Sequence, residues 1–208
     1  MVVFDLSRFS VLTTDLSGVP GDFGVLKMSE LLNGVLIRRI RYSDTSLIVS
    51  WFTDRYGKIR TIAKGALRQT SAFSGKLDLF YHCDLLLSFS RKTDLHTLRE
   101  VSIRATFERI RKDYLKTSVA SYFVELIEEV TEPDHAVPEI YHLLLRALGY
   151  LDTKMPGARG VLFFESELCK CLGLHAPDSH SAADRLVEAF GRLPKSRAQL
   201  MSRLTHHE

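Results

Sequence analysis

Cysteine is scarce in this sequence of 208 residues, which has only three, and two of them, Cys169 and Cys171, lie two positions apart. This number and spacing do not suit a disulfide framework, so we expect reduced thiols and a cytoplasmic protein. The sequence has no run of about 18 apolar residues, so it predicts no membrane-spanning helix. Residues 1–18 lack a basic segment followed by an apolar core, so no secretory signal is expected.

Signatures of catalysis are also missing. The sequence contains no P-loop, GxGxxG, HExxH or GxSxG motif. Three turn aspartates, Asp44, Asp54 and Asp78, could hold Mg²⁺, but isolated turn aspartates more often form Asx turns. Cys169 and Cys171 fall in an expected helix, where residues two apart point about 200° away from each other, a poor geometry for tetrahedral zinc. We therefore expect no enzymatic activity, no bound metal and no other cofactor.

What the sequence does have is an uneven distribution of charge, which the net charge of +3 conceals. Residues 34–104 contain thirteen Lys and Arg against six Asp and Glu, whereas residues 105–190 contain nine against fourteen. A basic block followed by a mildly acidic one is typical of a polyanion-binding module joined to a second domain.

The basic block has the pattern of β-strands, with β-branched and aromatic residues between turn residues. The candidate strands are residues 35–40, 46–53, 58–64, 80–90 and 95–103. A turn at 54–57 contains Gly57, which suits a positive φ, and residues 90–94 form a polar hairpin connection. Five strands in about seventy residues favour a small closed barrel, for which an OB-fold is the economical choice.

After residue 103 the apolar spacing becomes helical. The candidate helices are residues 105–130 with a break near 116–118, 138–150, 158–172 and 181–190. The predicted fold class is α+β, with an N-terminal five-stranded OB-fold β-barrel followed by an α-helical domain. The predicted divisions are an N-terminal extension of uncertain structure (1–32), the barrel (33–104), the helical domain (105–191) and a polar tail or frayed helix (192–208). Residues 1–27 are either an ordered extension or precede a translation start at Met28.

The basic residues of the barrel form a candidate polyanion-binding surface. Residues 58–64 alternate, which places Lys58, Arg60 and Lys64 on one face and Ile59, Thr61 and Ala63 on the other. An OB barrel offers cations to phosphates and aromatic rings to bases. The candidate contact residues are Arg38, Arg39, Arg41, Lys58, Arg60, Lys64, Arg68, Lys76, Arg91 and Lys92. The aromatic residues nearby are Tyr42, Trp51, Tyr56 and Phe73, of which we expect Trp51 to be in the core.

Two segments of the barrel resemble a known family. Residues 34–49, GVLIRRIRYSDTSLIV, and residues 52–66, FTDRYGKIRTIAKGA, resemble the N-terminal domain of the bacterial recombination mediator RecO. Residues 74–87 and 94–100 continue the resemblance, and residues 163–177, FFESELCKCLGLHAP, are similar to the family's FxxxLLxxLGxxP helix end. The resemblance covers residues 33–190 and depends on the ordered combination of these segments.

The resemblance implies a function and a set of partners. The family binds single- and double-stranded DNA, anneals complementary strands, and acts with RecR to load the recombinase RecA onto strands coated by single-strand-binding protein. It therefore implies that the tail of single-strand-binding protein is a partner and that the protein works in the cytoplasm at the nucleoid. Of the basic residues named above, it implies DNA contacts by Arg38, Arg39, Arg41, Lys58, Arg60, Lys64 and Arg68. Many members also carry a four-cysteine zinc site after the LGxxPxL stretch. Here LGLHAPD (172–178) is followed by SHSA, so that zinc module is missing.

Two other functions remain open from the residues alone. An RNA-binding OB-fold protein has the same composition as a DNA-binding one. A small metal-dependent nuclease, using the turn aspartates with Mg²⁺, is the less favoured alternative.

Overall fold

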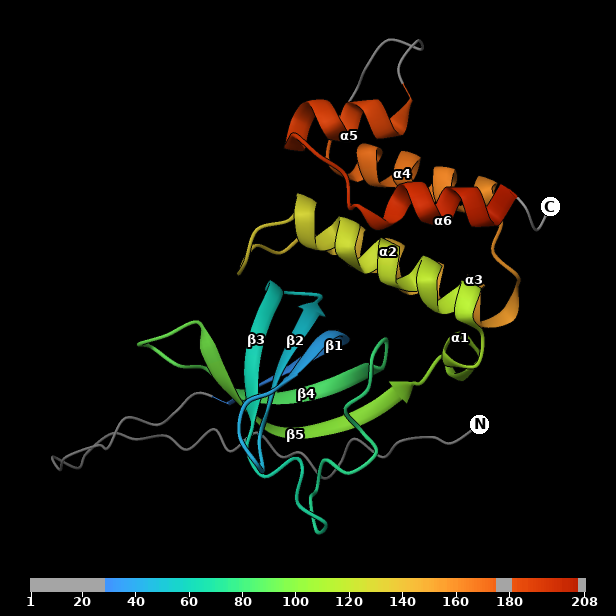
Figure 1. Cartoon of the computed structure of the whole chain (residues 1–208). Helices are drawn as coiled ribbons and strands as arrows, with labels where there is room; N and C mark the ends of the chain where they lie inside the picture. Colours follow the sequence, from blue (N-terminus) through green and yellow to red (C-terminus); the bar gives the residue numbers. More distant parts are fainter. Residues whose placement is uncertain (1–28, 175–180, 206–208) are drawn as a thin grey trace, which may run out of the picture.

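A computed structural model of the chain describes residues 29–174 and 181–205, and Figure 1 shows a β-barrel with a layer of helices packed over one end. The strands are β1 (Ser29–Arg41), β2 (Leu47–Thr53), β3 (Gly57–Ala63), β4 (His82–Ser88) and β5 (Leu95–Ala105). The helices are α1 (Glu108–Arg111), α2 (Tyr114–Val130), α3 (Pro138–Thr153), α4 (Ala158–Cys171), α5 (Ala182–Phe190) and α6 (Ser196–Thr205). Residues 1–28 of the predicted N-terminal extension (1–32), with the possible translation start at Met28, lie outside the described residues, whereas residues 29–32 belong to β1.

The five strands close into a barrel in the order β1-β2-β3-β5-β4, which confirms the predicted OB-fold class. β1 closes it, because its first half pairs with β4 (Ser29 opposite Ser88) and its second half pairs with β2 (Arg41 opposite Leu47). The strand is therefore longer than the predicted 35–40. Its first six residues are held by β4, which comes much later in the sequence, so no local pattern reveals them.

The barrel interior is filled by alternate residues of every strand. Trp51 is fully buried there, as expected, and its indole N–H donates a hydrogen bond to the Thr61 hydroxyl at 2.9 Å. On β3, Ile59, Thr61 and Ala63 are buried while Arg60 is exposed, so the predicted alternation is confirmed. The alternation of residues in the sequence therefore determines which side chains point outward from the barrel.

The helical layer is centred on α2, which has a buried stripe of apolar residues facing α3, α4 and the barrel. The predicted break in this region is misplaced by a few residues. The chain breaks after α1, and the Asp113 side chain caps α2 by accepting a hydrogen bond from the Lys116 N–H at 2.9 Å. Thr117 and Ser118, within the predicted break, lie inside α2 and donate their hydroxyls to the carbonyls of Ile110 and Tyr114.

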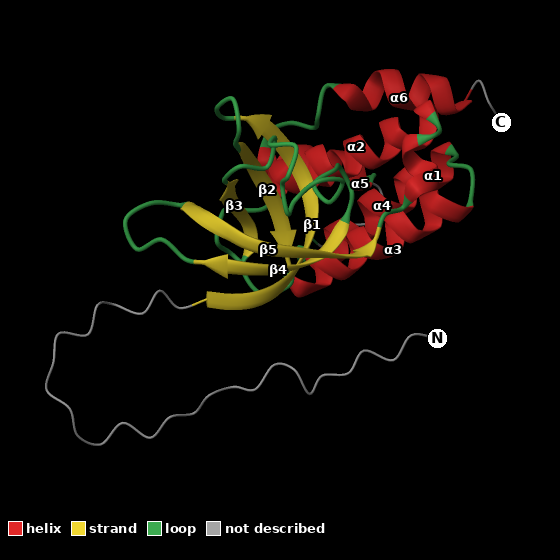
Figure 2. Cartoon of the chain, turned by 90° about the horizontal axis from the view of Figure 1, so that it is seen from below, coloured by secondary structure: helices red, strands yellow, loops and turns green. Residues whose placement is uncertain are grey.

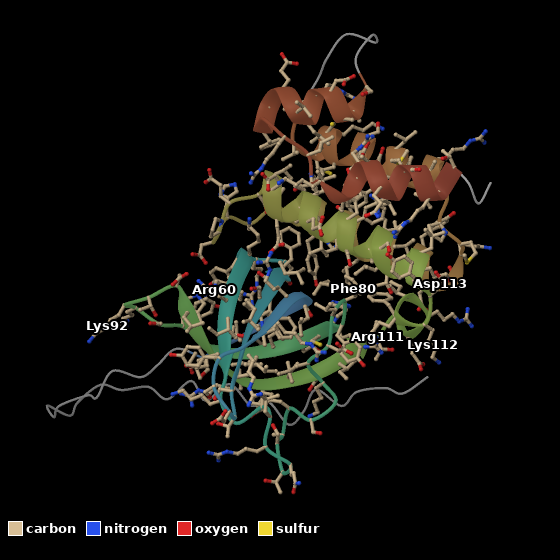
Figure 3. The ribbon with its side chains drawn as sticks, in the orientation of Figure 1. Arg60, Phe80, Lys92, Arg111, Lys112 and Asp113 are labelled. Atoms are coloured by element: carbon tan, nitrogen blue, oxygen red, sulfur yellow. The ribbon has the colours of Figure 1, made fainter. Side chains whose placement is uncertain are left out.

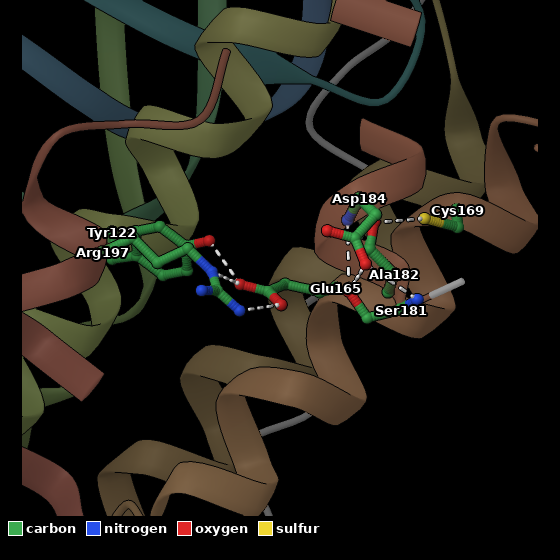
Figure 4. A network of polar contacts seen from close by, with 7 residues as sticks. All are labelled: Tyr122, Glu165, Cys169, Ser181, Ala182, Asp184 and Arg197. Carbon is green, nitrogen blue, oxygen red and sulfur yellow. Dashed lines mark hydrogen bonds and ion pairs between the residues drawn. The ribbon is translucent and has the colours of Figure 1, made fainter. Parts of the chain in front are cut away.

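Residues 196–205 form α6, where the sequence predicted a tail or a frayed helix. The helix is mostly polar, but Leu200 and Leu204 are buried against α2 and α4. Arg197 adds a polar anchor, because its guanidinium forms two hydrogen bonds, of 2.6 and 2.9 Å, to the fully buried Glu165 carboxylate on α4. The Tyr122 hydroxyl of α2 donates to the same carboxylate at 2.5 Å (Figure 4). Side chains of α2 and α6 therefore both bind the buried carboxylate of α4.

The barrel and the helices share one apolar cluster. Val35, Ile37 and Phe52, on the outer side of the barrel, are buried with residues of α2 and α3. A hydrogen bond of 3.0 Å joins the Tyr141 hydroxyl of α3 to the His82 ring of β4. Figure 2 shows the two layers side by side, with the β4–β5 connection projecting from the barrel. No helix within the described ranges is long and apolar enough to cross a membrane.

The β2–β3 turn lies directly against the loop that follows α2. Gly57 has a φ of 59°, and a Cβ at this position would lie 1.9 Å from the His135 carbonyl oxygen. The neighbouring Asp134 N–H donates to the Lys58 carbonyl at 3.1 Å. A glycine is therefore required both by the backbone conformation and by the loop that follows α2.

Candidate nucleic-acid interface

Side chains of three neighbouring strands form rows on the outer face of the barrel. Strand pairing places Arg38 beside Ser50 and Ser50 beside Arg60. The next row consists of three aliphatic side chains, Ile40, Ile48 and Ile62. Ile40 is 52% exposed, so this part of the barrel is an apolar strip bordered by arginines. Such a surface can receive bases beside phosphates.

Four of the predicted arginines already have carboxylate partners. The pairs are Arg38–Glu128 (2.8 Å), Arg39–Asp78 (3.2 Å), Arg41–Asp44 (3.0 Å) and Arg60–Asp94 (3.2 Å). The four arginine side chains remain about half exposed or more. Exposed ion pairs contribute at most about 1 kcal/mol, so a phosphate can compete with each carboxylate.

Five of the six other predicted cations are free of such pairing. Their side chains form no ion pair or hydrogen bond with any residue in the part of the chain that the structure describes: Lys64, Arg68, Lys76, Arg91 and Lys92. Lys64 and Arg68 follow β3, whereas Arg91 and Lys92 lie in the β4–β5 connection, with Lys92 projecting from the barrel in Figure 3. All of these except the partly buried Lys76 are exposed.

Lys58 lies on the predicted face but is not an open surface residue. Its ammonium group donates a hydrogen bond of 2.7 Å to the Glu128 carbonyl of α2. Burial lowers the pKa of Lys58, and the nearby carboxylates of Glu128, Glu129 and Glu132 only partly offset this. The sequence pattern gave the correct face of the strand, but it could not reveal that α2 covers this end of it.

The aromatic residues near the basic strands have different environments. Tyr42 is 60% exposed directly after β1 and continues the apolar strip. Phe73 packs against the barrel core, and Tyr56 lies at the barrel rim, where its hydroxyl donates to Glu30 at 2.7 Å. Tyr42 and Tyr56 therefore remain available as platforms for bases, whereas Trp51 does not.

Helix α1 adds basic residues that the sequence prediction missed. Arg109 and Arg111 lie on this short helix, just beyond β5, and Lys112 directly follows it; Figure 3 shows Arg111 close to the barrel. Arg111 pairs with Asp78 at 3.0 Å and stacks over the Tyr81 ring at 4.5 Å. The division by charge assigned these residues to the acidic half, although the chain remains close to the barrel there.

A second surface lies on the helical layer, between α3 and α4. It is an apolar groove of 590 Å³ lined by Leu143, Leu151 and Phe163 among others, with Arg146 and Arg159 also in its lining. Phe163 is 64% exposed. Exposed apolar area of this kind, rimmed by charge, is typical of a protein-docking site.

The residues considered for metal chemistry are dispersed. Asp44 and Asp78 are paired with arginines, and Asp54 accepts a hydrogen bond from the Asn33 side chain at 3.0 Å. Within residues 29–174 and 181–205, no three His, Cys, Asp or Glu side chains gather as a metal site. Burial raises the pKa of the Cys83 thiol, in the barrel, to about 12.

Comparison with known proteins places this geometry in a family. Residues 28–107 match the family described as "Recombination protein O N terminal", and residues 111–190 match "Recombination protein O C terminal". The two matches cover the barrel and the helices as far as α5. The chain belongs to the RecO family.

Several curated RecO proteins are similar to this chain, and each is named as a DNA repair protein. That of Desulfatibacillum aliphaticivorans is 37% identical over 123 residues, covering 59% of this chain and 48% of the relative. That of Rhodopirellula baltica is 29% identical over 158 residues, covering 76% and 56%. That of Halalkalibacterium halodurans is 29% identical over 141 residues, covering 68% and 55%. The chain spans about half the length of the curated relatives it matches.

The four-cysteine zinc site implied by the RecO resemblance does not fit this chain, which has three cysteines in all. Cys83 lies in β4, and Cys169 and Cys171 lie on α4, where Cys169 is buried and donates its thiol to the Ala182 carbonyl at 3.5 Å. The segment 175–180, where the family's zinc ligands would begin, lies outside the described residues.

Proposed function

We propose that this chain binds single- and double-stranded DNA and anneals complementary strands as a mediator of recombinational repair. The observation that carries the proposal is the set of unpaired cations that flanks the three-strand face, on a barrel of the RecO family. Lys64 and Arg68 follow β3, and Arg91 and Lys92 lie in the β4–β5 connection, which leads into β5, the strand paired with β3 beside Arg60. Phosphates of a strand that crosses Arg60 can therefore be neutralised by cations from both segments.

In this proposal the protein supplies electrostatics and no bond-breaking chemistry. Two DNA strands repel each other through their phosphates, and a shared basic surface lowers that repulsion while the bases pair. Exposed arginines of the Arg38 row hold phosphates after exchanging their carboxylate partners. The function is thus that of a mediator without enzymatic activity, working in the cytoplasm at the nucleoid.

The partners belong to the same proposal. The tail of single-strand-binding protein docks in the α3–α4 groove, where apolar walls and the guanidinium groups of Arg146 and Arg159 suit an acidic peptide with apolar side chains. RecR acts together with this chain, and the recombinase RecA is reached indirectly, once the single-strand-binding protein has been displaced.

The central experiment is the annealing of two complementary, dye-labelled DNA strands in EDTA, with and without the protein. We expect faster annealing and a binding constant that falls with salt, with a log–log slope of roughly −3 to −5 if about four to six phosphates are neutralised. Salt-independent binding, or a strong preference for RNA over DNA of the same sequence, contradicts the proposal. Cleavage of labelled DNA that requires Mg²⁺ favours the nuclease instead.

The groove is tested separately with a fluorescent peptide of the single-strand-binding protein tail. Arg146→Glu combined with Arg159→Glu should weaken binding at least tenfold, because two attractions become repulsions. Lys154→Glu is the matched control, since Lys154 is exposed at the end of α3 and does not line the groove. Equal losses in both variants indicate a general charge effect and remove the groove as the docking site.

A further inference from the structure

A depression at the rim of the barrel has the features of a binding site for a single nucleobase. It lies between the β4–β5 connection, the β2–β3 turn and the loop after α2, and its volume is 620 Å³. Its lining includes the rings of Tyr56, Phe89 and His96. The residues that line the depression come from these three separate segments of the chain, so the depression exists only in the folded protein.

The three rings form a continuous aromatic surface. The Phe89 ring centre lies 4.9 Å from that of Tyr56 and 4.6 Å from that of His96. Tyr56 is fixed by the hydrogen bond from its hydroxyl to Glu30. Phe89 is only half-buried, which leaves part of its ring open to a ligand. A base that stacks on such a ring gains about 1–3 kcal/mol.

His96 supplies a hydrogen-bonding group at the same place. Its side chain is only 6% exposed, and its Nδ1 accepts a hydrogen bond from the Ser90 N–H at 3.2 Å. The neutral ring therefore carries its proton on Nε2. Nε2 has no hydrogen-bond partner among residues 29–174 and 181–205, although the ring lines the depression. Burial lowers the pKa of His96 against the opposing effect of the nearby Asp134 and Asp94, which favours the neutral form.

The charges around the depression are arranged for a base inside and phosphates outside. Arg91 and Lys92 lie on the rim, exposed and without ion pairs to the described residues. Asp94 is held by Arg60 at 3.2 Å, and the exposed Asp134 also lines the depression. A carboxylate disfavours a phosphate but accepts hydrogen bonds from the amino groups of a base. An uncharged base therefore fits the interior better than a phosphate does.

We propose that this depression takes one unstacked nucleobase of single-stranded DNA, stacked on Phe89, while Arg91 and Lys92 hold the adjacent phosphates. This rests on the proposed function, because it assigns a specific subsite to a DNA-binding barrel. A base within a duplex is stacked on its neighbours and cannot enter. The depression thus makes the chain distinguish single strands from duplexes, which the basic face alone does not do.

The first test needs no substitution. A single-stranded oligonucleotide carrying 5-iododeoxyuridine is bound to the full chain and irradiated, and the crosslinked peptides are identified by mass spectrometry. We expect crosslinks at Phe89, Tyr56 or His96, because the photoreaction requires contact between the base and a side chain. Crosslinks confined to other parts of the chain overturn the subsite while leaving DNA binding intact.

The second test compares variants on single-stranded and duplex DNA of equal length. Phe89→Leu keeps an apolar side chain but removes the aromatic face, and it should weaken single-strand binding about fivefold to tenfold with duplex binding unchanged. Lys92→Gln, on the same connection, should weaken both, because it removes a phosphate contact. Equal single-strand binding by Phe89→Leu and the wild type overturns the subsite, as does a loss of both; circular dichroism checks the fold. Failure of the wild-type chain to bind DNA at all contradicts the proposed function instead.

Discussion

The cations of the barrel differ in availability, and this difference decides which of them can be used to test DNA binding. Lys58 has the spacing of a surface contact, yet its ammonium group is committed to the Glu128 carbonyl and half-buried. Lys64 and Arg68 are exposed and unpaired within the described residues. A substitution at Lys58 would therefore change both the stability of the fold and the affinity for DNA. A substitution at Lys64 or Arg68 tests the affinity for DNA alone.

Replacing Lys64 and Arg68 together by glutamine should lower the affinity for DNA and reduce the magnitude of the salt slope. Two phosphate contacts correspond to a change of roughly 1.4 in the log–log slope for single strands. The melting temperature should stay within about a degree or two of the wild type, because surface substitutions change stability by less than about 0.5 kcal/mol. Lys154→Gln serves as the control on the helical layer. An unchanged slope in the double variant removes both residues from the interface.

Lys58→Glu should destabilise the chain by about 1–3 kcal/mol, measured by urea unfolding. The new carboxylate would face the Glu128 carbonyl and the carboxylates of Glu129 and Glu132, and the carbonyl would lose its donor. Lys58→Met keeps the apolar part of the side chain, so its free energy of unfolding should fall by less. Equal stability of the wild type and Lys58→Glu contradicts the packing of α2 against this residue.

At the scale of elements, α6 is attached to the helical layer by two buried leucines, Leu200 and Leu204, and by the ion pair of Arg197 with a buried carboxylate. Arg197→Met leaves the Glu165 carboxylate buried with only the Tyr122 hydroxyl as a partner. Breaking a buried pair from one side costs about 3–5 kcal/mol. Gln199→Ala, at an exposed position of the same helix, should stay within about 0.5 kcal/mol of the wild type. A similar urea midpoint for both variants shows that the network does not hold α6.

Two glycines in turns offer a matched comparison of the contact between the layers. Gly57 and Gly75 both have positive φ, but a Cβ meets the His135 carbonyl only at Gly57 and meets nothing within 4 Å at Gly75. Gly75→Ala should cost about 1–2 kcal/mol from the backbone alone, and Gly57→Ala should cost about 3 kcal/mol or more. Thermal unfolding distinguishes the two, and equal losses contradict the close approach.

The sequence predicted the secondary-structure elements better than the contacts between them. The alternation of residues 58–64 identified β3 and its outward face, because both depend on neighbours in the chain. The first half of β1 escaped prediction, since its partner is β4. Asp113 was missed as a cap because several polar residues nearby could serve equally well. The rim depression could not be foreseen at all, because Tyr56, Phe89 and Asp134 become neighbours only after the barrel closes and the helices dock.

At the scale of the whole molecule, the barrel and the helices are joined by groups that respond to pH. His82 bonds to Tyr141 across the junction, and burial, helped by Arg104, lowers the pKa of His82 below its ordinary value. A folded-state pKa below the unfolded one means that the unfolded chain binds the proton more readily. The stability contributed by neutral His82 is therefore present above about pH 6.5 and is lost as the pH falls below it.

The free energy of unfolding should accordingly fall between pH 7 and pH 5.5, and His82→Gln should reduce this slope. The pKa of His96 is also lowered by burial, so His96 contributes in the same direction. The His82→Gln variant therefore keeps part of the pH dependence of stability. Urea titrations at several pH values measure both slopes. A wild-type stability that rises on acidification over this range contradicts the assignment.

The buried Glu165 carboxylate has a consequence for the chain as it leaves the ribosome. Its cation, Arg197, follows it by 32 residues, which at about 5–20 residues per second is roughly 2–6 seconds of synthesis. Throughout that interval a docked α4 would hold a charge with no counterion, so the emerging helices stay loosely associated. The barrel strands have all been made by then. Translation thus separates the barrel and the helical layer in time, and α4 gains its counterion only when α6 has been synthesised.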